Sequence, residues 1–98
     1  MEQERLIGNI EREAKNLVDT LRRKNSDYGN SFSELFSEIG MPYAYIHMAE
    51  KLNRIKSIMD SHGTHSVSES MEDSIRDLAG YAILTLAHIN DDDSEPTA

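Results

Sequence analysis

The segment from residue 66 to residue 90 constrains this chain most, because its apolar residues surround a predicted helix instead of lining one side. At roughly 100° per residue, one side of that helix carries Met71, Ile75, Leu78, Ala82 and Leu86. Tyr81, Ile83 and Leu84 lie well off that side. A helix that is apolar almost all round is buried on most sides. A chain of 98 residues can hardly cover it alone, so we expect a homo-oligomer, a dimer or higher.

Two helices are predicted before residue 41. Apolar residues recur at spacings of three and four between residues 3 and 23, which indicates one amphipathic helix. The turn formers of residues 24–30 interrupt that pattern. Ser31 and Glu34 have the spacing of a capping box, which predicts a short second helix. Gly40 is placed to end it as a left-handed C-terminal cap.

Two longer helices are predicted after it. Pro42 suits the first turn of a third helix that extends to about Asp60. Its predicted core stripe comprises Tyr45, Met48, Ala49, Leu52, Ile55 and Met59. Ser66 and Glu69 form a second capping box that opens the last helix. The expected fold is therefore all-α: a bundle of three long helices plus one short helix, forming a single helical domain over residues 1–90. Residues 91–98, with four acids and a proline, are expected to form an acidic disordered tail.

Composition narrows the classes of partner. The net charge is −8, from 18 acids and 10 bases, which argues against direct binding of duplex DNA. A free nucleotide stays compatible, since a divalent cation can bridge carboxylates to phosphates. No apolar run approaches the roughly 20 residues of a membrane span, so no membrane association is expected. The chain has no cysteine and starts without a signal-peptide pattern, so we expect a cytoplasmic protein.

Three acids follow one edge of the last predicted helix. Glu69, Asp73 and Asp77 are four residues apart, so they stack and repel one another weakly. A hard divalent cation such as Mg²⁺ would relieve that repulsion. Alternatively, Arg76 and solvent satisfy them near a helix N-terminus, where the helix dipole favours acids. The alternative fits Asp77 least well, because Asp77 lies in the third turn.

Polar residues of the third predicted helix allow two interpretations. Glu50 and Arg54 have the spacing of an ordinary exposed ion pair. Alternatively, Glu50 adds a carboxylate to the metal site while Lys51 and Arg54 bind phosphate oxygens.

The predicted turn after the first helix is also open to two interpretations. It contains Lys24, Asp27 and Tyr28. It is either a plain connection between helices or a place where Lys24 meets a phosphate and Tyr28 meets a base or sugar.

The chain resembles the nucleotide modification associated domain, type one, in three stretches, which are Lys24–Phe32, Glu50–Ile55 and Val67–Ala82. Their order and spacing agree over roughly residues 15–88. That family occurs in bacteria and their phages, so the resemblance implies a bacterial or phage protein that makes or handles modified nucleotides.

The chain is also similar, more loosely, to the MazG-like all-α nucleoside triphosphate pyrophosphohydrolases. That resemblance implies a magnesium site with Glu50 on one helix and Asp73 and Asp77 on the next. Glu69, which shares their spacing on the last helix, is a further candidate. The chain departs from the pattern of that family, because it has His47-x-x-Glu50 on the earlier helix and Asp73-x-x-x-Asp77 on the later one. Expected substrate-binding residues are Lys24, Asp27, Tyr28, Lys51, Arg54 and Tyr81.

The sequence therefore predicts a nucleotide-binding helical domain of nucleotide metabolism or modification. One hypothesis is a magnesium-dependent pyrophosphohydrolase. The others are a non-catalytic nucleotide-binding or regulatory oligomerisation module, and a purely structural oligomer.

Overall fold

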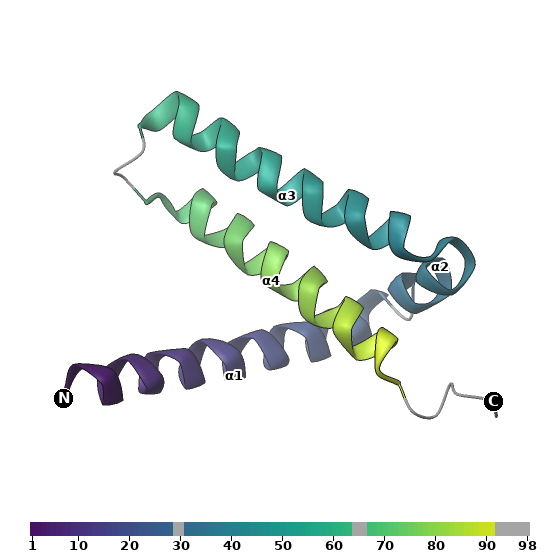
Figure 1. Cartoon of the computed structure of the whole chain (residues 1–98), viewed down its shortest axis with the longest axis horizontal. Helices are drawn as coiled ribbons and strands as arrows, with labels where there is room; N and C mark the ends of the chain where they lie inside the picture. Colours follow the sequence, from purple (N-terminus) through teal and green to yellow (C-terminus); the bar gives the residue numbers. More distant parts are fainter. Residues whose placement is uncertain (29–30, 64–66, 92–98) are drawn as a thin grey trace. The chain divides into compact units, whose positions relative to one another are not determined.

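The computed structural model describes residues 1–28, 31–63 and 67–91, and the side chains of these residues except 26–28 and 62. The described part is all-α and contains the four predicted helices. They are α1 (Glu2–Tyr28), α2 (Ser31–Ile39), α3 (Met41–His62) and α4 (Glu69–Ile89), drawn in Figure 1. None of the described helices is both long enough and apolar enough to cross a membrane.

The chain divides into two compact units, Met1–Ser31 and Phe32–Ala98. The first unit is essentially helix α1. Glu2 and Glu4 in its first turn complement the helix dipole. The prediction that this helix stops at residue 23 is wrong, because it continues through the turn formers to Tyr28. Asn, Ser and Asp each disfavour a helix interior by only a few tenths of a kcal/mol relative to better helix formers, so they do not end a helix by themselves.

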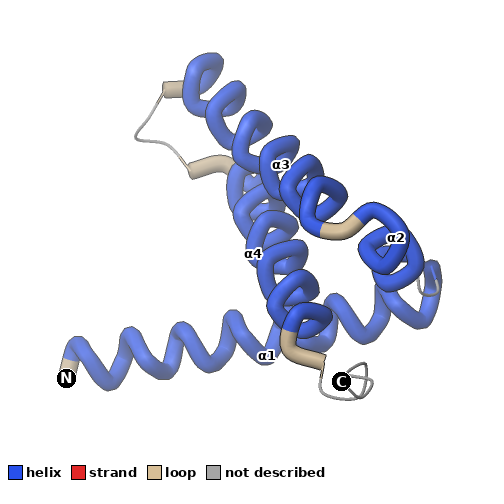
Figure 2. Tube along the Cα trace, turned by 45° about the vertical axis from the view of Figure 1, so that its right-hand side comes forward, coloured by secondary structure: helices blue, strands red, loops and turns tan. Residues whose placement is uncertain are grey.

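The second unit is built on an antiparallel pair, α3 and α4, which lie side by side in both Figure 1 and Figure 2. Gly40 joins α2 to α3 with φ 84° and ψ −155°. The backbone N–H of Gly40 donates to the carbonyl of Phe36 at 2.8 Å, closing α2. Gly40 ends α2 as predicted, but the predicted left-handed cap is not formed, because ψ is extended although φ is positive. Pro42 lies in the first turn of α3, as predicted.

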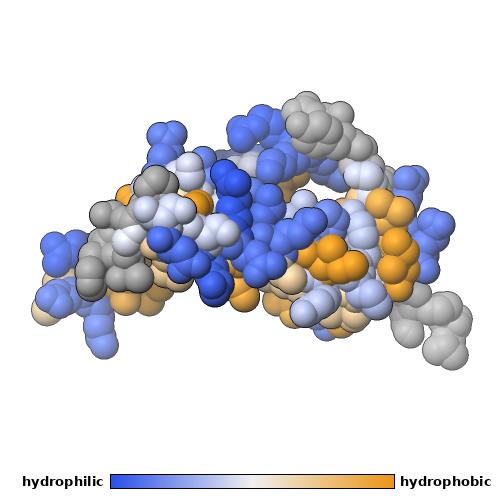
Figure 3. Space-filling view, turned by 90° about the horizontal axis from the view of Figure 1, so that it is seen from above, coloured by the Kyte–Doolittle hydropathy of each residue, from blue (hydrophilic) through white to orange (hydrophobic). Residues whose placement is uncertain are grey.

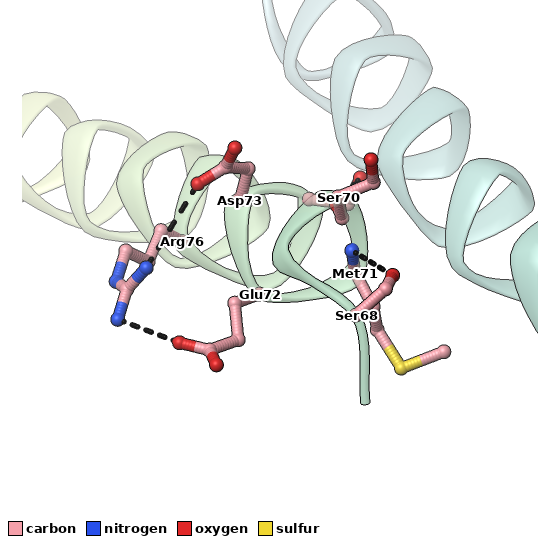
Figure 4. Close-up of polar contacts among 7 residues, drawn as sticks. Ser68, Ser70, Met71, Glu72, Asp73 and Arg76 are labelled. Atoms are coloured by element: carbon pink, nitrogen blue, oxygen red, sulfur yellow. Dashed lines mark hydrogen bonds and ion pairs between the residues drawn. The ribbon is translucent and has the colours of Figure 1, made fainter. Parts of the chain in front are cut away.

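The start of α4 differs from the prediction. Ser68 is the N-cap, and its side chain accepts a hydrogen bond from the backbone N–H of Met71 at 3.1 Å, as Figure 4 shows. Ser66, the predicted cap, lies outside the described residues. The tail predicted for residues 91–98 also lies outside them, apart from Asp91.

Small residues occupy the buried side of the pair. Ala44 of α3 is fully buried, and Ser74, Gly80 and Thr85 are buried on α4 together with Met71. The Ser74 and Thr85 hydroxyls donate to backbone carbonyls one turn earlier, at 3.0 Å and 2.7 Å. Small side chains that satisfy their own hydroxyls let two helices approach closely without leaving a polar group unpaired.

The predicted core stripes are therefore only partly buried. Leu52 and Tyr45 of α3 are exposed, as are Ile75 and Leu86 of α4. Met71, in the predicted stripe of α4, is buried as expected. The side that each helix turns toward the other is therefore rotated from its most apolar side toward smaller residues, and part of each apolar stripe stays at the surface of the unit.

Candidate functional site

An ion pair joins α3 to α4 near the middle of the hairpin. Lys51 Nζ lies 3.2 Å from Asp77 Oδ2, and the two side chains are 27% and 35% exposed. Asp77, the acid for which solvent near the helix N-terminus was the least satisfactory partner, thus has a charged partner. The partner is a cation from the neighbouring helix, and water still reaches both groups.

A ring contact lies one turn along from the ion pair. The imidazole of His47 stacks on the ring of Tyr81, with centroids 4.7 Å apart and an interplanar angle of 17°. His47 and Lys51 are four residues apart on α3, and Asp77 and Tyr81 are four apart on α4, so each pair shares a side of its helix. The antiparallel register thus places His47 opposite Tyr81 and Lys51 opposite Asp77.

The Tyr81 hydroxyl is held in its protonated form. Burial raises the pKa of Tyr81 above its usual value of 10.0, and the nearby Lys51 ammonium opposes that effect. Tyr43, Asp77 and Glu50 add to the increase in pKa. The phenol is therefore a neutral hydrogen-bond donor at physiological pH, next to a lysine and two carboxylates.

Aromatic residues extend the site toward α2. Tyr43 contacts His47 edge to face at 4.6 Å between centroids, and Phe32 of α2 lies 5.4 Å from Tyr43 and 6.2 Å from Tyr81. His88 lies 5.3 Å from Phe32. Only the i,i+4 spacing of Tyr43 and His47 could have suggested part of this cluster.

His88 also fixes α2 to the end of α4 through hydrogen bonds. Its Nε2 lies 2.7 Å from the Ser33 hydroxyl, and its Nδ1 lies 2.7 Å from the Leu84 carbonyl. Because a carbonyl can only accept, Nδ1 carries the proton, and in the neutral ring Nε2 accepts from Ser33. Nothing in the sequence pairs residues 33 and 88, so sequence reasoning missed this contact.

Other predicted residues surround the ion pair without joining it. Glu50 is 65% exposed and lies 3.7 Å from His47 Nδ1. The predicted pair of Glu50 with Arg54 is not formed in the described part of the chain; Arg54 is exposed. Lys51 and Arg54 are three residues apart and so lie close to one another along α3.

The remaining acids of α4 turn to solvent and to Arg76. Asp73 Oδ1 lies 3.9 Å from Arg76 Nη1, and Glu72 Oε1 lies 3.0 Å from Arg76 Nη2; both pairs appear in Figure 4. Glu69 is exposed in the first turn. For Asp73 and Glu69, the ordinary interpretation of acids near a helix N-terminus accounts for what is seen.

The donor set for magnesium does not assemble in one chain. Asp77 pairs with Lys51, Asp73 pairs with Arg76, and Glu50 lies near His47. Over the described ranges, no group of three His, Asp or Glu side chains is placed to hold a metal ion. The four predicted metal ligands do not fit a magnesium site with this geometry, and magnesium binding stays a prediction.

The residues expected around the first turn belong to the other unit. Lys24 is exposed in the last turns of α1. The side chains of Asp27 and Tyr28 lie outside the described part of the chain. The site described by the structure therefore consists of Lys51, Asp77, His47 and Tyr81, with Arg54 and Glu50 at its edge.

Comparison with known proteins identifies one family. Residues 24–89 match the model of the family described as nucleotide modification associated domain 1. The matched range is more than half of the chain and contains every residue of the site. No curated protein and no solved structure matches.

Proposed function

The chain belongs to the nucleotide modification associated domain 1 family, and from this premise we propose that the α3/α4 hairpin binds a nucleotide on the side where Lys51 meets Asp77. The observation that carries the proposal is the half-buried Lys51–Asp77 pair beside the stacked His47 and Tyr81 rings. The family description supplies the ligand class, and the side chains supply groups that suit it.

A phosphate group is the part of the nucleotide that this site suits best. The Lys51 side chain is only 27% exposed between the two helices, so its motion is already restricted and little side-chain entropy is lost on binding. Arg54 brings a second cation with a planar fork of donors suited to phosphate. The protonated Tyr81 hydroxyl donates a further hydrogen bond.

Asp77 competes with that phosphate for Lys51. In the ligand-free chain, the carboxylate of Asp77 neutralises the ammonium and offsets the cost of its partial burial. A phosphate that binds Lys51 must replace or share this contact. Asp77 therefore acts as a competitor of the phosphate for Lys51 and makes no contact with the ligand.

Hydrolysis of the nucleotide is the alternative for the same site. It needs magnesium, for which the carboxylates of one chain do not converge, so no observation favours it over binding alone. The role in nucleotide modification suggested by the family description is compatible with either.

A thermal-shift panel tests the proposal. The intact chain is melted with ribonucleoside and deoxyribonucleoside mono-, di- and triphosphates, with and without magnesium. A nucleotide at about 100 times its Kd stabilises the folded state by about 2.7 kcal/mol, which raises Tm by on the order of 10 °C for a domain of this size. An unchanged Tm with every nucleotide in the panel would refute the proposal.

Two additions separate the alternatives. Lys51→Met should lose the shift, whereas Lys56→Met should keep it, because Lys56 is 71% exposed and pairs with Asp60 within α3. Phosphate and pyrophosphate release are measured on the same samples. Release that depends on magnesium would favour hydrolysis, and a shift without release favours a binding domain.

A further inference from the structure

One side of the α3/α4 hairpin is apolar and has no described partner within its unit. The residues that define this apolar face are Met41, Tyr45, Leu52, Ile75, Leu86 and Ile89, which are 47% to 66% exposed. Hydrophobic surface exposed between hydrophilic regions is visible in Figure 3. By contrast, Ala44 and Met71 are the only hydrophobic residues that are buried in the described part of the chain.

The two helices contribute to the same side of the hairpin. On α3, Tyr45 directly follows the buried Ala44, and Leu52 directly follows Lys51, which pairs across to α4. One residue corresponds to a rotation of about 100° away from the contact side. Because α3 and α4 are antiparallel, the same rotation on each helix leads to the same side of the pair.

On α4 the same rule holds. Ile75 directly follows the buried Ser74, and Leu86 directly follows the buried Thr85. The residues that precede the contact positions, Glu50 and Asp73, lie by the same reasoning on the opposite side. The hairpin therefore has this apolar face on one side, whereas Glu50 and Asp73, at the edge of the proposed nucleotide site, lie on the other.

We propose that two copies of this chain pair through the apolar face, so that their α3/α4 hairpins form a four-helix core. Six half-exposed large side chains present several hundred Å² of apolar surface, which approaches the roughly 800 Å² per partner of a standard interface. A monomer rarely leaves a contiguous patch of that size uncovered.

The absence of net charge on the apolar face suits a second copy as the occupant. The chain carries −8 overall, so two copies repel at long range, and this repulsion is smallest where they meet through a face without net charge. Charged residues at the border of the apolar side toward the loop include Lys56, Asp60 and Glu72. Each is paired within its own helix, Lys56 with Asp60 at 3.1 Å and Glu72 with Arg76 at 3.0 Å. Because each ion pair is neutral, two identical faces can meet without like-charge repulsion at this border, as a two-fold interface requires.

This pairing leaves Lys51 and Tyr81 accessible, because the edge of the proposed nucleotide site lies on the other side of the hairpin. The proposal therefore does not rest on the proposed function. A dimer that binds no nucleotide would support the pairing and contradict the function, and a monomer that binds nucleotide would do the reverse.

Sedimentation of the intact chain tests the pairing. The wild type should sediment as a dimer of 11.1 kDa chains at micromolar concentration. Leu52→Glu should weaken dimerisation at least about 30-fold, since it places a charge in the interface centre. Ser57→Glu is the matched control, because Ser57 is exposed and does not lie on the apolar face. This substitution should leave the dimer intact. A monomeric wild type, or equal dimerisation of all three, would overturn the proposal.

Cysteine cross-linking keeps the test valid if Leu52→Glu does not fold. The chain has no cysteine, so Leu52→Cys and Ser57→Cys each carry a single thiol. A short bismaleimide should link two Leu52→Cys chains and leave Ser57→Cys chains unlinked. A monomer in which the cysteine at position 52 is protected from maleimide would mean that another part of the same chain covers the face, and would overturn the pairing.

Discussion

Removing the charge of Asp77 is the perturbation with the most definite consequence for the ligand-free protein. Asp77→Asn keeps the shape of the side chain and leaves Lys51 without the carboxylate 3.2 Å from its ammonium. Pairs at the surface contribute about 0–1 kcal/mol, and breaking a buried pair costs about 3–5 kcal/mol. With 27% and 35% of the two side chains exposed, this pair lies between those limits.

We therefore expect Asp77→Asn to lower the free energy of unfolding by about 1.5 kcal/mol, an intermediate value between exposed and buried pairs. For a domain of this size, that corresponds to a Tm lower by on the order of 5–10 °C. Urea unfolding followed by circular dichroism measures the change directly. Magnesium should not alter the difference between the two proteins.

Glu72→Gln is the matched control. It removes the same charge from an ion pair that is slightly shorter, 3.0 Å to Arg76, but in which both side chains are 51% exposed. If burial decides the energy of the pair, Glu72→Gln should cost less than about 0.5 kcal/mol. Equal losses in the two variants would refute the reasoning from burial. An Asp77→Asn protein that is as stable as the wild type without magnesium, and that loses a magnesium-dependent stabilisation, would show that Asp77 is a metal ligand instead.

Three further results are expected. Burial raises the pKa of Tyr81 in the folded state, so the contribution of its protonated hydroxyl to stability is complete below pH 10.0 and is lost as pH rises through the higher folded-state pKa. Alkaline unfolding should therefore begin at lower pH in the wild type than in Tyr81→Phe. An identical onset in the two proteins would contradict this prediction. Ser68→Ala removes the acceptor for the Met71 backbone N–H and should cost about 1 kcal/mol in urea unfolding; an unchanged midpoint would mean that the cap does not stabilise α4. Gly40→Ala forces a side chain into a backbone conformation that only glycine readily adopts, with φ 84° and ψ −155°, and should cost about 1–3 kcal/mol; a loss below 0.5 kcal/mol, on the order of an ordinary surface substitution, would show that the α2–α3 connection relaxes.

The sequence was sufficient to predict the helices but not their contacts. Periodicity and turn residues predicted four helices and the end of α2 at Gly40, because these depend on local spacing. The end of α1 was misplaced, since turn formers disfavour a helix only weakly. The buried sides of α3 and α4 were predicted only in part: Met71 is buried as predicted, whereas Leu52 and Ile75 are exposed. The most apolar side of each helix was taken as the core, whereas the small residues Ala44, Ser74 and Gly80 are buried.

The candidate site was predicted only in part for a similar reason. Lys51, Asp77 and Tyr81 were each selected from the sequence, but the pairing of Lys51 with Asp77 depends on the register between α3 and α4. A change of one turn in that register would pair Lys51 with Asp73 or Tyr81 instead. The contributions of His47, Tyr43 and Phe32 follow from the same register, and local sequence contains no signal for it.

In the proposed site, a nucleotide phosphate and the Asp77 carboxylate compete for Lys51. Calorimetric titration of each nucleoside triphosphate into the wild type, Lys51→Met and Asp77→Asn measures this competition. The two variants should change affinity in opposite directions: Lys51→Met should bind at least about tenfold more weakly, the loss of one charge-assisted contact, and Asp77→Asn should bind more tightly than the wild type. Weaker binding by both variants, or no binding by the wild type, would contradict the account.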